Sequence, residues 1–151
     1  MSGPALTVDV AVIAGDPPRS ILLVRRANEP FAGSWALPGG FVEGGERVAD
    51  GAARELDEET GVRADTLELL GIYDTPGRDP RFPTVSVVYV MLTDAELEAR
   101  GGDDAAEARW HALDALPALA FDHAAVVCDA VSFAARARRR SASRQDAPPA
   151  A

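Results

Sequence analysis

Apolar residues along the chain fall into short runs separated by polar turns. Alternating or continuous apolar runs predict β-strands at residues 6–14, 20–26, 67–74, 84–93 and 107–113. Apolar residues at helical spacing predict one helix ending near Gly61 and a second beginning near Asp122. Strands on both sides of a helix, followed by a closing helix, predict an α/β protein with a mixed β-sheet sandwiched between helices.

The first predicted helix carries an unusual concentration of negative charge. Glu55, Glu58 and Glu59 stand at positions i, i+3 and i+4, which places their carboxylates on one side of the helix. Arg54 can neutralise one or two of them. A hard divalent cation with oxygen ligands, foremost Mg²⁺ with Mn²⁺ as a substitute, would relieve the remaining repulsion. The alternative interpretation is a solvated acidic helix face.

The wider pattern favours the metal site. Gly40, Glu46 and the run from Arg54 to Val62 together resemble the Nudix box, and residues 35–40 resemble its usual lead-in. The resemblance implies a Nudix α/β/α sandwich with a mixed β-sheet. It also implies a divalent-metal-dependent enzyme that hydrolyses a nucleoside diphosphate linked to another group.

The resemblance assigns roles residue by residue. Metal ligands and catalytic positions fall on Glu55, Glu58 and Glu59, and the Gly39 carbonyl is expected to complete the coordination. Gly40 lets the backbone approach the metal closely. Two further assignments are supporting ones: Arg54 orients the carboxylates, and Glu46 braces the loop.

The general base is left open between a helix glutamate and an acid from a later loop. Glu107 is the later candidate, with Asp103 and Asp104 close by. Two departures from the family pattern predict local losses of stability. Arg47 stands where a capping Ser or Thr is usual, and Gly51 lies inside the helix at a cost of about 1 kcal/mol relative to Ala.

Segments outside the box bear on the substrate. Residues 73–81, 85–89 and 119–123 resemble the ADP-ribose pyrophosphatase branch, which implies hydrolysis of ADP-ribose to AMP and ribose 5-phosphate. Cleavage of a (deoxy)nucleoside triphosphate or a dinucleotide, and a non-catalytic ADP-ribose sensor, are the alternatives. Candidate phosphate or ribose contacts are the arginines, which offer a two-pronged donor: Arg25, Arg26, Arg78 and Arg81. Phe41 or Phe121 is expected to stack on adenine, and His123 is expected to be a surface or packing residue.

Composition limits the kinds of partner that the protein can bind. A net charge of −9 over 151 residues argues against nucleic acid as a binding partner, and no apolar run is long enough to span a membrane. The single cysteine, Cys128, excludes an internal disulfide and is expected in the core. Together with the lack of an evident signal peptide, this predicts a cytoplasmic location. The resemblance adds a possible homodimer.

The chain is expected to form a single domain over residues 1–135. Residues 136–151 are first basic and then rich in Ser, Pro and Ala. They are expected to form a disordered tail.

Overall fold

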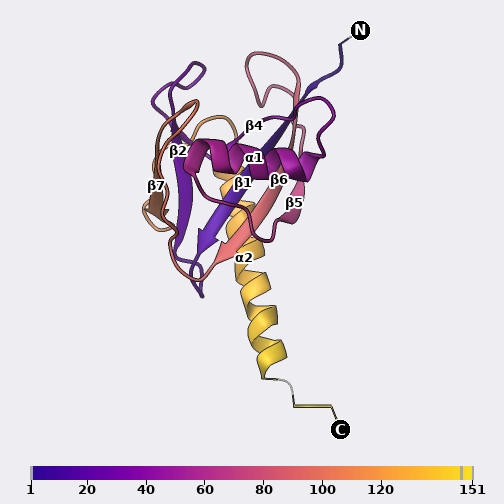
Figure 1. Ribbon diagram of the computed structural model, residues 1–151, viewed down its shortest axis with the longest axis vertical. Helices are drawn as coiled ribbons and strands as arrows, with labels where there is room; N and C mark the ends of the chain where they lie inside the picture. Colours follow the sequence, from indigo (N-terminus) through magenta and orange to yellow (C-terminus); the bar gives the residue numbers. More distant parts are fainter. Residues whose placement is uncertain (1, 147, 151) are drawn as a thin grey trace.

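The computed structural model describes residues 2–146 and 148–150, and in it one mixed sheet lies between two helices (Figure 1). The first half of the chain supplies most of the sheet and the first helix, and the second half supplies the remaining strands and the second helix. In chain order the elements are β1 (Ala5–Ala14), β2 (Ser20–Arg26), β3 (Trp35–Ala36), β4 (Gly39–Phe41), α1 (Val48–Thr60), β5 (Glu68–Tyr73), β6 (Thr84–Thr93), β7 (Ala105–Ala112) and α2 (His123–Gln145).

The seven-stranded sheet has the order β3-β2-β1-β6-β5, with β4 paired to β1 and β7 paired to β2. β1 and β6 run parallel along their whole lengths, from the pair Ala5 and Thr84 to the pair Ala14 and Thr93. Every other pairing of the described strands is antiparallel. This arrangement confirms the predicted mixed sheet.

β1 is apolar on both faces because a helix covers each of them. Val8, Val10 and Val12 pack into one core with Leu56 of α1. Ile13, one residue out of step, packs into a second core with residues of α2. The alternation of strand side chains therefore divides the interior between the two helices.

α1 begins without a side-chain cap at Arg47, as the sequence predicted, and ends at Gly61 in the left-handed conformation (φ 73°). Gly51 has a reason that the sequence did not reveal. A Cβ atom there would lie 2.8 Å from Oε1 of Glu46, so the glycine makes room for a carboxylate. The interpretation of Gly51 as a simple stability loss is therefore corrected.

α2 continues beyond the sheet to Gln145 (Figure 1), so the prediction of disorder from residue 136 is wrong for residues 136–145. Arg138 ties this part of the helix to the sheet. Its Nη2 donates to the Thr93 carbonyl at 2.8 Å, and its Nη1 lies 3.3 Å from Oδ1 of Asp94. Part of the expected tail, residues 147 and 151, lies outside the described residues.

The core prediction for Cys128 is also wrong, because its side chain is exposed. The buried face of α2 is formed by Val126, Val127, Ala130 and Ala134, and Cys128 lies off that stripe. Neither described helix has the length and apolar character needed to cross a lipid bilayer.

Candidate active site

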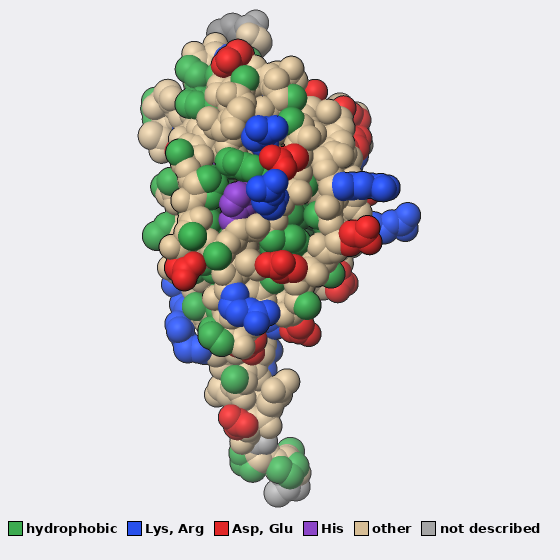
Figure 2. Space-filling model, turned by 90° about the vertical axis from the view of Figure 1, so that its left-hand side faces the viewer, with side chains coloured by type: hydrophobic (Ala, Val, Ile, Leu, Met, Phe, Trp, Pro, Cys, Tyr) green, Lys and Arg blue, Asp and Glu red, His purple; other side chains and the backbone are tan. Residues whose placement is uncertain are grey.

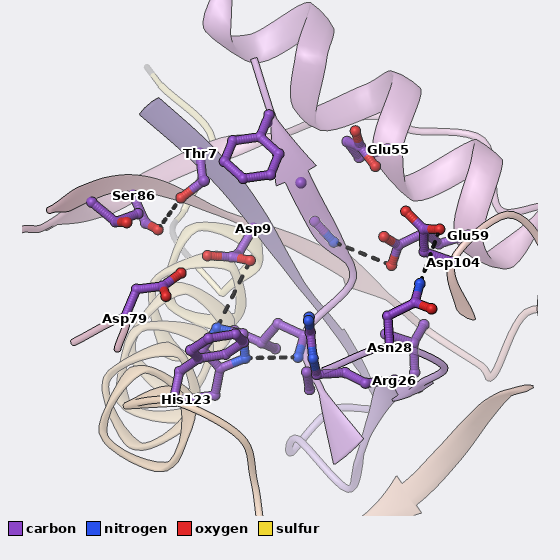
Figure 3. Close-up of a pocket in the computed structure, with 18 of the residues that line it drawn as sticks. Thr7, Asp9, Arg26, Asn28, Glu55, Glu59, Asp79, Ser86, Asp104 and His123 are labelled. Atoms are coloured by element: carbon purple, nitrogen blue, oxygen red, sulfur yellow. Dashed lines mark hydrogen bonds and ion pairs between the residues drawn. The ribbon is translucent and has the colours of Figure 1, made fainter. Parts of the chain in front are cut away.

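A pocket of about 380 Å³ opens between α1, the glycines of β4, and the start of α2 (Figure 3). It is within the usual size range of small-molecule sites. Glu55 and Glu59 line it from α1, while Asp9 and Ser86 line it from the central strands β1 and β6. Residues from distant parts of the chain therefore meet around one cavity.

Glu55 and Glu59 are both buried, at 8% exposure each. Burial, followed by the charge of Glu55, raises the pKa of Glu59 to about 8. Burial also raises the pKa of Glu55. Two neighbouring buried carboxylates repel each other, and Arg54 forms an ion pair with only one of them, Glu55, so a bound cation would relieve the remaining repulsion.

β4 approaches the same carboxylates closely because it lacks side chains. A Cβ atom on Gly40 would lie 2.6 Å from Oε1 of Glu55. The Gly39 N–H donates to Oε2 of Glu59 at 3.4 Å. The glycine pair thus brings main-chain polar groups beside the carboxylates.

Arg54 organises the outer side of α1. It donates to Glu46 at 3.1 Å through Nε and at 2.8 Å through Nη2, and Nη1 donates to Glu55 at 2.8 Å and Glu58 at 3.1 Å. Nη2 also donates to the Phe41 carbonyl at 3.0 Å. One guanidinium therefore fixes the helix, the preceding loop and β4 relative to one another.

The predicted metal ligands are only partly assembled. Among the described residues, no three His, Cys, Asp or Glu side chains are grouped as a ready cation site. Glu58 is exposed, does not line the pocket, and is held by Arg54. Glu55 and Glu59 nevertheless fit a divalent cation, because they are buried oxygen donors next to close main chain.

The structure does not bring Glu107, the predicted later general base, to the pocket. Glu107 lies on β7, where it pairs with Arg25 at 3.4 Å and Arg109 at 2.9 Å. Neither Glu107 nor Arg25 lines the pocket, so neither of these predicted site residues is brought to it. Asp104 does line the pocket, and its charge helps to raise the pKa of Glu59.

Asp9 and His123 form the pocket floor, opposite α1 (Figure 3). Nε2 of His123 lies 3.9 Å from Oδ1 of Asp9, and Nδ1 accepts the Leu37 N–H at 3.0 Å. Burial lowers the pKa of His123 and raises the pKa of Asp9. His123 is thus buried in the pocket floor, which agrees with the packing role expected for it and excludes the surface one.

Arg78 lines the pocket, but its donors are already engaged. Its side chain is 5% exposed, and it donates to Asp122 through Nε at 3.0 Å and through Nη2 at 2.7 Å. Nη1 donates to Ser86 at 2.6 Å. Arg78 therefore fastens the loop before β6 to the start of α2, and it is not a free phosphate contact.

Two other predicted arginines remain at the pocket wall, each against an aromatic ring. The guanidinium of Arg26 lies 4.9 Å from the ring centroid of Phe121, and that of Arg81 lies 5.9 Å from the centroid of Phe41. Asp79 holds Arg81 by hydrogen bonds of 3.1 and 2.8 Å. Figure 2 shows basic, acidic and hydrophobic side chains side by side on one face of the molecule, around a visible histidine.

Asp9 is the main site residue that sequence reasoning missed. It interrupts the apolar run of β1 between Val8 and Val10, and an aspartate is rarely buried without a partner. That interruption was the available signal. Asn28 is a second missed pocket residue, and it donates to Oδ1 of Asp104 at 3.3 Å.

Comparison with known proteins points to one family. A profile of the NUDIX domain matches residues 4–130. The ADP-ribose pyrophosphatase of Methanocaldococcus jannaschii is 47% identical over 127 residues, covering 83% of this chain and 72% of that protein. The ADPR responsive transcriptional repressor NtrR of Acinetobacter baylyi is 37% identical over 80% of this chain, but the match spans only half of the repressor.

A solved structure agrees with these matches. The NUDIX domain of Shewanella oneidensis NrtR, crystallised with ADP ribose, superimposes with a TM-score of 0.79 at 30% identity. The match covers 88% of this chain and 90% of that one. The fold, a mixed sheet between two helices, and the site, with the glutamates of α1 beside the β4 glycines, agree with the profile match. This chain belongs to the Nudix family.

Proposed function

We propose that this protein is a Mg²⁺-dependent Nudix hydrolase that cleaves ADP-ribose and water into AMP and ribose 5-phosphate. The observation that carries the proposal is the pair of buried carboxylates, Glu55 and Glu59, at one end of a nucleotide-sized pocket. The likeness to an ADP-ribose pyrophosphatase over most of the chain, and to a domain crystallised with ADP ribose, supports the choice of substrate.

Glu55 and Glu59, with the Gly39 carbonyl, would hold the divalent cation, and Arg54 would keep Glu55 in place. When bound, such a cation neutralises phosphate oxygens and lowers the pKa of water near them. Asp104 lies at the same end of the pocket, and this position supports Asp104 as the later-loop carboxylate that acts as the general base and removes the water's proton. Mn²⁺ would substitute for Mg²⁺ at oxygen ligands of this kind.

The opposite walls suit the rest of the substrate. Arg26 and Arg81 provide positive charge for the diphosphate, and Phe41 and Phe121 provide ring faces for the adenine. Phe41 is 47% exposed, so its ring is open to a ligand. These contacts compensate locally for the chain's net charge of −9.

One alternative has specific support. The similarity to an ADPR responsive repressor favours a protein that binds ADP-ribose without cleaving it. The sequence keeps all three glutamates of α1, and two of them, Glu55 and Glu59, line the pocket, which favours catalysis. Hydrolysis of a deoxynucleoside triphosphate or a dinucleotide stands as a second alternative.

The test is a substrate panel with purified protein and Mg²⁺. AMP and ribose 5-phosphate are phosphomonoesters, so added phosphatase releases phosphate from the products but not from ADP-ribose. We expect the highest kcat/KM for ADP-ribose, and loss of turnover in Glu59→Gln. A higher kcat/KM for a deoxynucleoside triphosphate would overturn the choice of ADP-ribose as substrate. Calorimetric binding of ADP-ribose without turnover would favour the non-catalytic ADP-ribose sensor.

The domain boundary and the homodimer remain predictions. The family match at residues 4–130 supports a single catalytic domain. Leu69 and Ile72, which are 56% and 64% exposed on the edge strand β5, are the apolar surface that a second copy would cover.

A further inference from the structure

Asp9 and His123 face the same part of the pocket, yet the proposed metal chemistry uses neither. Asp9 is 7% exposed, and its Oδ1 lies 3.9 Å from Nε2 of His123, which is too long for a hydrogen bond. Because Nδ1 of His123 accepts the Leu37 N–H, the neutral ring carries its hydrogen on Nε2. A donor and an acceptor therefore face each other across the floor without bonding (Figure 3).

The nearby hydroxyls do not satisfy Asp9 fully. Ser86 lies close enough to lower the pKa of Asp9. However, the Ser86 hydroxyl also accepts from Nη1 of Arg78 at 2.6 Å and is hydrogen-bonded to the Thr7 hydroxyl. A carboxylate offers about four acceptor positions, and among the described residues only the Ser86 hydroxyl bonds to Asp9, so most of those positions have no hydrogen bond from the protein. Buried acceptors are normally hydrogen-bonded, so we expect a polar group of a bound ligand to pair with Asp9.

A hydroxyl group fits this pair better than the other polar groups of a nucleotide. Its oxygen can lie about 2.8 Å from both Nε2 and Oδ1, because their separation of 3.9 Å is less than twice that distance. It can accept from His123 and donate to Asp9 at the same time. The adenine amine only donates and would leave Nε2–H unpaired, while a phosphate oxygen only accepts and would be repelled by Asp9.

The position of the pocket floor indicates which hydroxyl of the substrate would bind there. Asp9 is paired with Gly39 across β1 and β4, and the Gly39 N–H donates to Glu59 at 3.4 Å. The floor therefore adjoins the carboxylates proposed to hold the diphosphate. In a nucleoside diphosphate derivative the sugar is bonded directly to phosphate, whereas the base is one sugar further away.

We propose that Asp9 and His123 bind a ribose hydroxyl of the substrate and make the pocket selective for ribose over deoxyribose. This inference rests on the proposed function, because it assumes that the diphosphate lies at Glu55 and Glu59. It adds a specificity determinant that is separate from the metal-binding carboxylates.

The first test uses the wild-type protein alone, so it does not depend on a variant folding. ADP-ribose and a set of analogues that each lack one ribose hydroxyl are compared by kcat/KM. We expect one analogue to react about 10 to 100 times more slowly, as for loss of a hydrogen bond to a charged group. Equal kcat/KM for every analogue would overturn the proposal.

The second test links that hydroxyl to Asp9. Asp9→Asn and Asp9→Ala should lose about the same factor with ADP-ribose, yet change little with the disfavoured analogue, because the contact is already missing there. Asp114→Asn, the same change in the exposed turn after β7, should leave both substrates unaffected. An equal loss with every substrate would assign Asp9 a structural role and overturn the proposal.

The two levels of failure are distinguishable. If the wild-type protein does not hydrolyse ADP-ribose with Mg²⁺ or Mn²⁺, the proposed function fails, and this inference fails with it. If ADP-ribose is hydrolysed but no hydroxyl matters, only the ribose contact is wrong.

Discussion

The guanidinium of Arg54 and the carboxylate of Glu46 form a two-pronged pair, with Nε to Oε2 at 3.1 Å and Nη2 to Oε1 at 2.8 Å. This pair lowers the pKa of Glu46 and leaves Nη1 free to hold Glu55. Glu46 is thus a brace for the helix and not a pocket residue.

Arg54→Lys is therefore expected to reduce kcat by about 10- to 100-fold, the usual effect of losing an outer contact to a metal ligand. A lysine ammonium cannot make both bonds to Glu46 and also reach Glu55. Steady-state kinetics with ADP-ribose measures the loss, and Arg47→Lys, at the exposed start of α1, is the matched control. Equal activity of the two variants would contradict the bracing role.

Gly51→Ala tests the close approach of Glu46. Replacing a helix glycine by alanine normally stabilises a protein by up to about 1 kcal/mol. Here the new Cβ would lie 2.8 Å from Oε1 of Glu46, so the carboxylate must move away from Arg54. We expect lower kcat/KM with no rise in Tm.

A second substitution isolates the cause. In a Glu46→Ala background the clash is absent, so adding Gly51→Ala should leave kcat/KM unchanged and raise Tm. A further loss of activity in the double variant would show that Gly51 acts through something other than Glu46.

Glu59→Gln is expected to lower kcat by a factor of about 100 or more while the fold is kept, because it removes a charged oxygen ligand without changing the side chain's size. Titration calorimetry with Mg²⁺ should show weaker binding in parallel. Asp57→Asn, an exposed change on the same helix, should behave like the wild type. Near-normal turnover of Glu59→Gln would remove Glu59 from the ligand set.

The raised pKa of Glu59 predicts how stability depends on pH without metal. An unfolded glutamate loses its proton near pH 4.5, whereas folded Glu59 keeps its proton until about pH 8. Between these values the unfolded state binds fewer protons, so the free energy of unfolding should decrease as pH rises. Since one pKa unit corresponds to about 1.4 kcal/mol, the total decrease is on the order of a few kcal/mol.

Urea unfolding in EDTA at pH 5, 6.5 and 8 measures this slope. Glu59→Gln should flatten it, because the amide does not titrate, and saturating Mg²⁺ should flatten it for the wild type. The raised pKa values of Asp9 and Glu55 act in the same direction, whereas the lowered pKa values of His123 and His111 act in the opposite direction below about pH 6.5, so a residual slope remains. Identical slopes for the wild type and the variant would contradict the burial of an ionisable Glu59.

The sequence predicted the elements that rest on local pattern. Apolar runs located the long strands, and the spacing of Glu55 and Glu59 placed both carboxylates on the pocket side of α1. It could not predict pairing across the sheet. Glu107 was misplaced because its partner, Arg25, comes from a strand far away in the chain.

The end of α2 and the pocket floor were missed for different reasons. Residues 136–145 are mostly Arg and Ala, which are strong helix formers, so the local sequence already favoured the helix that the prediction of disorder missed. The contacts of Arg138 with Thr93 and Asp94 could not be predicted from local sequence. His123 lies in the pocket floor because elements from elsewhere in the chain surround it, among them Leu37, whose N–H it accepts.

The parallel ladder of β1 and β6 has a consequence for how the protein is made. It joins residues 79 positions apart, from Ala5 with Thr84 onward, so this edge of β1 gains its partner only when a very long loop closes, whereas the antiparallel pairings of β1 with β2 and β4 are more local. Folding that depends on such distant pairing is slow. During synthesis, the edge of β1 that pairs with β6 lacks its partner until residues 84–93 have been made, after more than half of the chain.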